Sequence, residues 1–179
     1  MKSVKYYCSI SQIYKNIFIS DIKNACDVYE LKRYNIKAVL YLGTSNKDCK
    51  LLDRYADNNI SHKFLQIGDT NKAHISDCFE PAWNFINNHV DRGNSILIHC
   101  VKGISRSPTI VTYYLTRKIQ EKMSLVGNIE YVVDDILDLI KEYRPCINPN
   151  KNFIKQLKNY EHITVSKFKN ELERPSIPV

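Results

Sequence analysis

Four apolar runs are spaced along the first 100 residues of the chain. They read QIYKNIFISD, IKAVLYLG, HKFLQIGD and SILIHC, and they occupy residues 12–21, 36–43, 62–69 and 95–100. Each run has the length and the content of aliphatic and aromatic residues that are typical of a strand. Since SILIHC is the most apolar of them, we expect its strand to lie in the middle of a sheet.

Between and after these runs, apolar residues recur three and four positions apart, which is the spacing of one helix face. This pattern predicts helices over residues 24–35, 75–90, 107–122, 128–143 and 148–161. The apolar side predicted for the first helix consists of Ala25, Val28, Tyr29 and Leu31. Pro108 suits the first turn of the third helix, where its missing N–H leaves no hydrogen bond unmade.

The alternation of strands and helices predicts an α/β fold, with a central, mostly parallel sheet flanked by helices. We expect one folded domain over residues 11–163, preceded by an N-terminal segment over 1–10 and followed by a C-terminal tail over 164–179, which contains two prolines. In such sheets, ligands bind at the carboxyl ends of the strands. Cys100 ends the predicted central strand, so the functional site is expected there.

The composition agrees with one globular domain. Of the 179 residues, 44% are hydrophobic and 25% are charged, which excludes a wholly disordered chain. The formal net charge of +7 indicates anionic partners, and phosphoproteins, nucleic acid and acidic membrane surfaces all stay open. The high content of Lys, Asn, Ile and Tyr is typical of an AT-rich coding genome, such as that of a protist or a large virus.

The N-terminal sequence lacks the apolar core and the cleavage site of a signal peptide, and no apolar run approaches the length of a membrane span. We therefore expect an intracellular protein, cytoplasmic or nuclear. The cysteines form no CxxC pair and no zinc-binding spacing with histidine, so we expect reduced thiols and no metal site. The six cysteines are Cys8, Cys26, Cys49, Cys78, Cys100 and Cys146.

The turn HCVKGISRS, at residues 99–107, combines the features of a phosphate site. A helix that begins near Ser107 directs its free N–H groups and the positive end of its dipole back at the turn. Gly103 permits the positive φ that a tight ring of inward amides requires, and the planar guanidinium of Arg106 can bind two phosphate oxygens. The expected phosphate-binding loop consists of Val101, Lys102, Gly103, Ile104, Ser105 and Arg106.

Cys100 lies at the base of this expected loop. The same dipole and arginine would stabilise a thiolate, which can attack phosphorus in line and form a phosphocysteine. The loop amides and Arg106 would carry the developing charge, so no cofactor is expected. The alternative is a cysteine that only packs at a strand end. However, the combination of His, Cys, Gly and Arg at this spacing is expected by chance in only about two of ten thousand such chains.

Residues 99–107 resemble the active-site loop of the cysteine-dependent protein tyrosine phosphatase superfamily. GISRSPTI is similar to the dual-specificity branch in particular, and RPCINPNKNFIKQL at residues 144–157 resembles the C-terminal helix of that branch. The similarity extends over most of the chain. It implies a catalytic domain over residues 11–163 that hydrolyses phosphotyrosine, phosphoserine and phosphothreonine in phosphorylated protein substrates.

Dephosphorylation also needs an acid that protonates the leaving oxygen. Asp69 follows a predicted strand, 31 residues before Cys100, and IGDTNKAHI resembles the acid loop of the family. The main rival, Asp77, falls in a predicted helix, where the dipole favours a carboxylate in the first turn. We therefore expect Asp69 to be the general acid.

Three residues beside the cysteine have expected supporting roles. We expect His99 to lie behind Cys100 and to hydrogen-bond the loop, rather than to act as a base or a metal ligand. The resemblance implies that Ser107 assists the departure of the thiolate from the phosphoenzyme; its alternative role is a helix N-cap, and the two could coexist. Ser105 is expected to line the loop through its amide.

Three features depart from the family pattern. Lys102 stands where small or apolar residues are common, and it either favours highly anionic substrates or is a solvated lysine. His74 replaces a frequent aspartate of the acid loop. Additional residues before Arg144 predict an extended helix over 124–143, which is either solvent-facing or a docking surface.

Other functions of the superfamily stay open. The basic charge and Lys102 keep an RNA 5′-triphosphatase and a phosphoinositide phosphatase as alternatives. A pseudophosphatase that only binds phosphoproteins is the contrasting class, and the presence of Cys100, Arg106 and Asp69 argues against it. We expect no stable nucleic-acid partner, and the sequence leaves the oligomeric state open.

Overall fold

The computed structural model describes residues 9–45, 49–127 and 130–172. Its sheet has five strands in the order β1-β2-β5-β3-β4, so the strand predicted to be central is central. The pairs β2–β5, β5–β3 and β3–β4 are parallel, and β1 runs antiparallel to β2. The strands are β1 (Ser11–Tyr14), β2 (Ile17–Ser20), β3 (Ile36–Gly43), β4 (Ser61–Gln66) and β5 (Ser95–His99).

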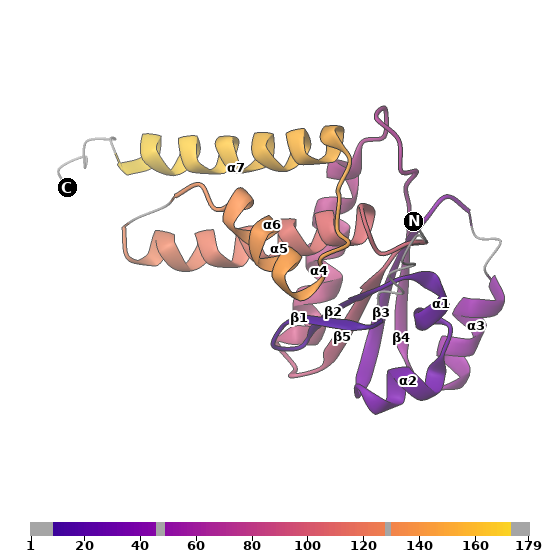
Figure 1. Cartoon of the computed structure of the whole chain (residues 1–179). Coiled ribbons are helices and arrows are strands. Elements are labelled where there is room, and N and C mark those ends of the chain that lie inside the picture. The colour runs from indigo at the N-terminus through magenta and orange to yellow at the C-terminus, as the bar shows by residue number, and fades with distance from the viewer. Residues whose placement is uncertain (1–8, 46–48, 128–129, 173–179) are drawn as a thin grey trace.

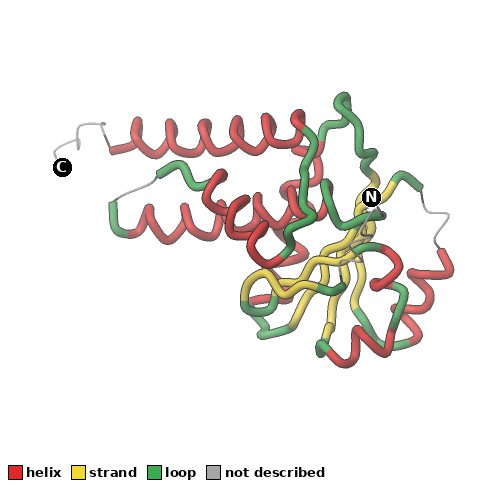
Figure 2. Tube along the Cα trace, viewed as in Figure 1, coloured by secondary structure: helices red, strands yellow, loops and turns green. Residues whose placement is uncertain are grey.

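Helices cover both faces of this sheet (Figures 1 and 2). The short helices α1, α2 and α3 pack on one face, α4 and α5 pack on the other, and α6 and α7 lie against α5. This arrangement confirms the predicted α/β fold. The helices are α1 (Ile22–Ala25), α2 (Val28–Arg33), α3 (Cys49–Asp57), the 3-10 helix η2 (Ile75–Cys78), α4 (Phe79–Val90), α5 (Arg106–Leu125), α6 (Val133–Tyr143) and α7 (Lys151–Leu172).

The side chains of β5 alternate between two hydrophobic cores. Ile96 and Ile98 are fully buried in the core beneath α4 to α7, whereas Leu97 is fully buried in the core beneath α1 to α3. A strand that is buried on both faces forms a continuous apolar run, which is why this one could be predicted. Burial of side chains of this size contributes about 1.5–3 kcal/mol each. The carboxyl end of β5, which Cys100 follows, is therefore fixed in position.

The first apolar run is a hairpin and not the single strand that was predicted. β1 and β2 pair with each other, and the chain reverses at Lys15 and Asn16 between them. Lys15 has a φ of 38°, in the left-handed region that tight turns use. The turn was missed because these two polar residues interrupt the apolar run only briefly.

The helix predicted over residues 24–35 is wrong in its continuity and in its apolar face. The carboxylate of Asp27 accepts hydrogen bonds from the N–H groups of Tyr29 and Glu30 and starts a separate helix, α2. Tyr29, which was expected on the buried side, is 86% exposed. The helix α3 was not predicted, because it is short and four of its nine residues are charged.

The extended helix predicted over residues 124–143 does not form. Instead, α5 continues to Leu125, and α6 begins only at Val133. The carboxylate of Glu161, a buried residue of α7, accepts hydrogen bonds from the N–H groups of Val132 and Val133 and so caps the start of α6. A helix start that depends on a distant residue leaves no local signal in the sequence. Residues 128 and 129 lie outside the described part.

The last helix is longer than predicted. It was expected to end at residue 161, but α7 continues to Leu172 (yellow in Figure 1). Residues 164–172 therefore continue a helix, and the expectation of a tail is wrong for them; residues 173–179 lie outside the described part. Within the described ranges, we find no helix whose length and apolar character would let it cross a membrane.

The expectation of reduced cysteines holds for three of them. Cys26, Cys78 and Cys100 are free thiols. Cys146, in contrast, is disulfide-bonded, so the expectation is wrong at this position. Sequence spacing gave no indication of this bond, because pairing depends on distances that only the fold sets.

Candidate active site

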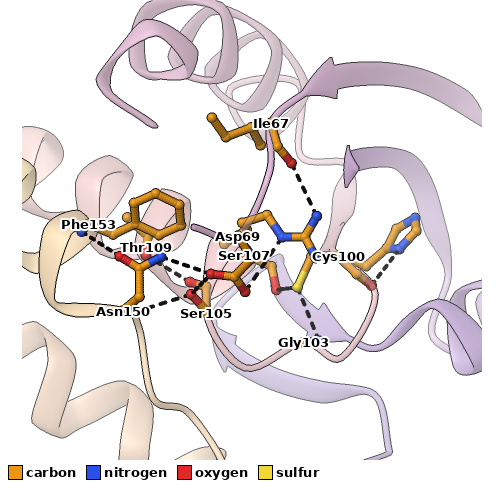
Figure 3. Close-up of polar contacts among 11 residues, drawn as sticks. Ile67, Asp69, Cys100, Gly103, Ser105, Ser107, Thr109, Asn150 and Phe153 are labelled. Carbon is orange, nitrogen blue, oxygen red and sulfur yellow. Dashed lines mark hydrogen bonds and ion pairs between the residues drawn. The ribbon is translucent and has the colours of Figure 1, made fainter. Parts of the chain in front are cut away.

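The loop between β5 and α5 surrounds the Sγ atom of Cys100 (Figure 3). Cys100 is only 1% exposed. Its Sγ accepts a hydrogen bond of 3.2 Å from the backbone N–H of Gly103 and one of 3.4 Å from the hydroxyl of Ser107. The sulfur is therefore surrounded by donors, an arrangement that stabilises its anionic form.

Four carbonyl groups of the loop are bonded to donors outside it. Because the N–H and C=O groups of a peptide point in opposite directions, carbonyls that are engaged outside leave the amides free to face the centre. The loop is thus shaped to receive an anion. The carbonyl of Val101 accepts a hydrogen bond from the amide of Ile22 (3.1 Å), and the carbonyl of Gly103 accepts one from Nε of Arg144 (2.8 Å). The carbonyl of Ile104 accepts a hydrogen bond from the amide of Asn148 (2.8 Å). The carbonyl of Ser105 accepts two, from the amide and the hydroxyl of Thr109 (3.1 and 2.7 Å).

The environment of Cys100 lowers the pKa of its thiol. Burial acts in the opposite direction and is the largest effect, but the hydrogen bonds from Ser107, the positive charge of Arg106 and the amide of Gly103 together outweigh it. Cys78 is also buried, and there burial, with a smaller effect of Asp77, raises the pKa to about 11. The donors around the sulfur, and not its burial, make Cys100 suited to be a nucleophile.

Arg106 begins α5 and is 6% exposed. Its Nη1 donates a hydrogen bond of 3.2 Å to the carbonyl of Ile67, which holds the guanidinium in place. Its Nε lies 3.8 Å from a carboxylate oxygen of Asp69 and has no hydrogen-bond partner among the described residues. This N–H is therefore free to bind an oxygen of an anion in the loop.

Asp69 lies on the loop after β4, which ends at Gln66, earlier than predicted. Its Oδ1 accepts hydrogen bonds from the hydroxyl of Ser105 (2.7 Å) and from Nδ2 of Asn150 (2.9 Å), as Figure 3 shows. The N–H of Asn150 in turn donates to the Ser105 hydroxyl at 3.2 Å. The structure thus brings the expected acid to the rim of the expected phosphate loop.

Two of these contacts were not foreseen. Ser105 was expected to act through its amide, but its side chain holds Asp69. Asn150 was not singled out, although its Oδ1 also accepts a hydrogen bond of 3.0 Å from the N–H of Phe153 at the start of α7. Asn150 fell inside the helix predicted over residues 148–161, whereas the structure places it directly before α7, where its side chain caps the first turn.

His99 lies behind the cysteine, as expected. The residue is fully buried, and its ring stacks on that of Tyr41 with the centroids 4.6 Å apart. Its Nδ1 lies 3.4 Å from the carbonyl of Cys100, and its Nε2 lies 3.4 Å from the hydroxyl of Tyr55. This enclosed position, away from the open side of the loop, agrees with a supporting role.

Arg144 is the main residue that the sequence did not identify. It is 1% exposed, and its Nη1 donates hydrogen bonds to the carbonyl of Ser9 (2.8 Å) and the hydroxyl of Ser11 (3.1 Å), in addition to the bond from its Nε to Gly103. Burial lowers the pKa of Arg144, although Asp21 and Cys100 act in the opposite direction. The residue was noticed only as part of a run that resembles the family.

Gly103 is required for this close packing. Its φ is +66°, and a Cβ atom there would clash with the carbonyl of Ser20 and lie 2.5 Å from Nη2 of Arg144. Any other residue would therefore displace either the β2 terminus or the arginine.

The remaining expected residues differ in position: Ser107 lies beside the Cys100 sulfur, and the others are exposed. Ser107 is not the helix N-cap that was considered, since it lies inside α5 and its hydroxyl is bonded to Cys100. Lys102 is exposed, and Val101 is 45% exposed, so both lie on the open side of the loop. Asp77 and His74 are also exposed, and Asp77 belongs to η2.

Relatives of this chain carry phosphatase names. A "Probable rhodanese domain-containing dual specificity protein phosphatase" of Dictyostelium discoideum is 41% identical over 106 residues, which are 59% of this chain and 20% of that protein. The tyrosine-protein phosphatase yvh1 of Schizosaccharomyces pombe is 30% identical over 151 residues, which are 84% of this chain and 41% of that protein. The chain thus spans a fifth of the first relative and less than half of the second.

Solved structures agree in fold. The crystal structure of DUSP15 is 27% identical and has a TM-score of 0.72, covering 92% of this chain and 95% of that one. The phosphatase domain of Yvh1 from Chaetomium thermophilum has a TM-score of 0.74, with 87% of this chain and 96% of that one covered at 22% identity.

The sequence also matches a family model. Residues 17–163, which run from β2 into α7 and include the whole loop around Cys100, match the model described as dual specificity phosphatase, catalytic domain. Together with the geometry of that loop, this match identifies the chain as a member of the dual specificity phosphatase branch of the protein tyrosine phosphatase superfamily.

Proposed function

We propose that the chain hydrolyses phosphotyrosine, phosphoserine and phosphothreonine in proteins through a phosphocysteine intermediate. The observation that carries this proposal is the thiol of Cys100, whose pKa is lowered and whose Sγ lies within a loop with four carbonyl groups bonded outside. The match over residues 17–163 and the pairing of β1 with β2 support a catalytic domain over 11–163.

In the first step, the thiolate of Cys100 attacks phosphorus. The S–P bond forms while the bond from phosphorus to the substrate oxygen breaks. The loop amides and the free Nε–H of Arg106 bind the non-bridging oxygens, where negative charge concentrates. Asp69 supplies a proton to the leaving oxygen, and the hydrogen bonds from Ser105 and Asn150 hold its side chain at the rim of the loop for this transfer.

In the second step, water attacks the phosphocysteine. Asp69, now a carboxylate, takes a proton from this water, the S–P bond breaks, and inorganic phosphate leaves. The departing thiolate regains the hydrogen bonds from Ser107 and Gly103, which makes it a better leaving group. The cycle needs a reduced Cys100, because only the thiolate attacks phosphorus.

The test compares four substrates on the purified chain. A phosphotyrosyl peptide, a phosphothreonyl peptide, a phosphoinositide and an RNA with a 5′-triphosphate are offered to the wild type and to Cys100→Ser. We expect turnover of both peptides by the wild type and of neither by the variant. Intact-mass spectrometry of rapidly quenched samples should detect one added phosphate on the wild type and none on Cys100→Ser. If the phosphoinositide or the RNA were turned over faster than both peptides, the chain would instead be a phosphoinositide phosphatase or an RNA 5′-triphosphatase.

A further inference from the structure

A cavity of about 250 Å³ lies away from the catalytic loop, between the β1–β2 turn and the helices α4, α5 and α6. None of the residues that line it belongs to the loop around Cys100. Its apolar wall includes Ile17, Leu115, Ile119, Ile136 and Leu139. A cavity of about 150 Å³ with such a lining holds benzene. The larger volume here accommodates a substituted ring or a medium-length acyl chain.

The polar part of the lining carries positive charge. Lys15, Lys118 and Lys122 line the cavity, and Asp91 is the acidic residue among its lining residues. Asp91 already pairs with Lys118 at 3.6 Å. Lys15 and Lys122 form no ion pair with any residue that the structure describes. Two cations beside an apolar cavity complement a ligand with one negative charge and an apolar body.

Tyr114 adds an unsatisfied donor to the same wall. It lines the cavity and is 2% exposed, and its hydroxyl has no hydrogen-bond partner in the described part of the chain. Burial, followed by Asp91, Glu121 and Tyr14, raises the pKa of Tyr114, so the group keeps its proton at neutral pH. A buried hydroxyl without a partner is unfavourable, which marks this wall of the cavity as incompletely satisfied.

We infer that this cavity binds a small anionic amphiphile, with its apolar body against the aliphatic wall and its carboxylate at Lys15 and Lys122. The inference is independent of the proposed catalysis. Ligand binding in this cavity does not depend on Cys100, so a Cys100→Ser protein should bind the same ligand equally well.

Trp83 provides a direct reporter for this site. It is the single tryptophan of the chain, and its ring lies against Tyr114, with centroids 5.2 Å apart. The Nζ of Lys118, a lining residue, lies 5.2 Å from the centre of the Trp83 ring. Titration with octanoate should change the Trp83 emission along a saturable curve, whereas octylamine, which has the same chain length and the opposite charge, should bind at least about tenfold more weakly.

Charge reversal sharpens the test. In Lys15→Glu/Lys122→Glu, octanoate should bind about tenfold more weakly and octylamine more tightly, since two attractions become repulsions. The matched control Lys37→Glu/Lys155→Glu has the same net charge but changes exposed residues outside the cavity, and it should bind octanoate as the wild type does. An unchanged Trp83 signal, or equal loss in both double variants, would overturn the inference. So would a stable dimer, measured by sedimentation, that buries this face and excludes octanoate.

Discussion

The Nε of Arg144 donates a hydrogen bond of 2.8 Å to the carbonyl oxygen of Gly103, 41 positions earlier in the chain. The amide of the same glycine donates to the Sγ of Cys100 at 3.2 Å. A buried arginine after α6 therefore fixes the orientation of a donor to the thiolate, although it lies outside the loop itself.

Arg144→Met should loosen the loop and destabilise the fold. The substitution leaves the carbonyls of Gly103 and Ser9 without donors, so we expect the free energy of unfolding in urea to fall by about 2–4 kcal/mol. The misplaced amide of Gly103 should lower kcat/KM for a phosphotyrosyl peptide by about tenfold to a hundredfold. Arg117→Met, at a partly exposed arginine of α5, is the control. A loss of stability at Arg144 without any loss of kcat/KM would contradict the positioning role.

Gly103→Ala should be far more damaging than Gly93→Ala. Both glycines have a positive φ, but a Cβ at Gly93 meets nothing within 4 Å, whereas one at Gly103 clashes with Ser20 and approaches Arg144. We expect a loss of about 1 kcal/mol for Gly93→Ala and of more than about 3 kcal/mol for Gly103→Ala. Thermal or urea unfolding measures both. Binding of tungstate, a phosphate analogue, should persist in Gly93→Ala and disappear in Gly103→Ala. Equal losses of stability in the two variants would mean that backbone strain alone is responsible.

Cys100 should react with iodoacetamide at a lower pH than Cys78. Its pKa is lowered, whereas that of Cys78 is raised to about 11, so near neutral pH peptide mapping should detect alkylation of Cys100 first. Ser107→Ala removes one hydrogen bond to the sulfur, so it should move the alkylation profile of Cys100 to higher pH and leave that of Cys78 unchanged. Parallel profiles for the two thiols would contradict the electrostatic account of the loop.

The lowered pKa of Cys100 also predicts a pH dependence of stability. Above the ordinary pKa of a thiol, Cys100 is ionised in both the folded and the unfolded chain, and the stabilisation of the thiolate is complete. As the pH falls through the lowered pKa, the folded chain takes up the proton and this stabilisation is lost. The unfolding free energy of the wild type relative to Cys100→Ala should therefore rise with pH between the two pKa values, as urea titrations can measure. A difference that stays flat would mean that the thiol is not ionised.

Asp69→Asn should slow the release of poor leaving groups more than that of good ones. If Asp69 protonates the leaving oxygen, kcat for a phenyl phosphate should fall by about a hundredfold or more. An aryl phosphate with a strongly acidic phenol needs no proton and should lose far less. Asp77→Asn, at an exposed carboxylate in η2, is the matched control and should behave as the wild type. Equal losses on both substrates would assign the acid to another residue.

The parts of the fold that could be predicted are those with local signals. The strand β5 is apolar on both faces, and Cys100, Gly103 and Arg106 follow it in one contiguous run, so the central strand and its loop were visible in the sequence. The same holds for α4, whose apolar positions Phe79, Ala82 and Ile86 follow helical spacing.

The parts that were missed depend on contacts between distant residues. Glu161 caps α6 from another helix, so no pattern near Val133 could show where that helix begins. Arg144 is charged, and a charged residue is normally expected at the surface; only the fold shows that carbonyls at Ser9 and Gly103 replace water around it. Asn150 reaches Asp69 across 81 positions for the same reason.

The outward bonding of the loop carbonyls has a consequence for fragments of this protein. The donors come from Ile22 near the start of the fold, from Thr109 in the helix after the loop, and from Arg144 and Asn148 near its end. Consider a fragment that retains HCVKGISRS but lacks the N-terminal or the C-terminal part of the fold. In such a fragment, carbonyls of the loop would lose their donors and would be free to turn inward. Its amides would then no longer converge on one point. Limited proteolysis that cuts away either end should therefore abolish the binding of tungstate, a phosphate analogue, even where Cys100 and Arg106 remain in the fragment.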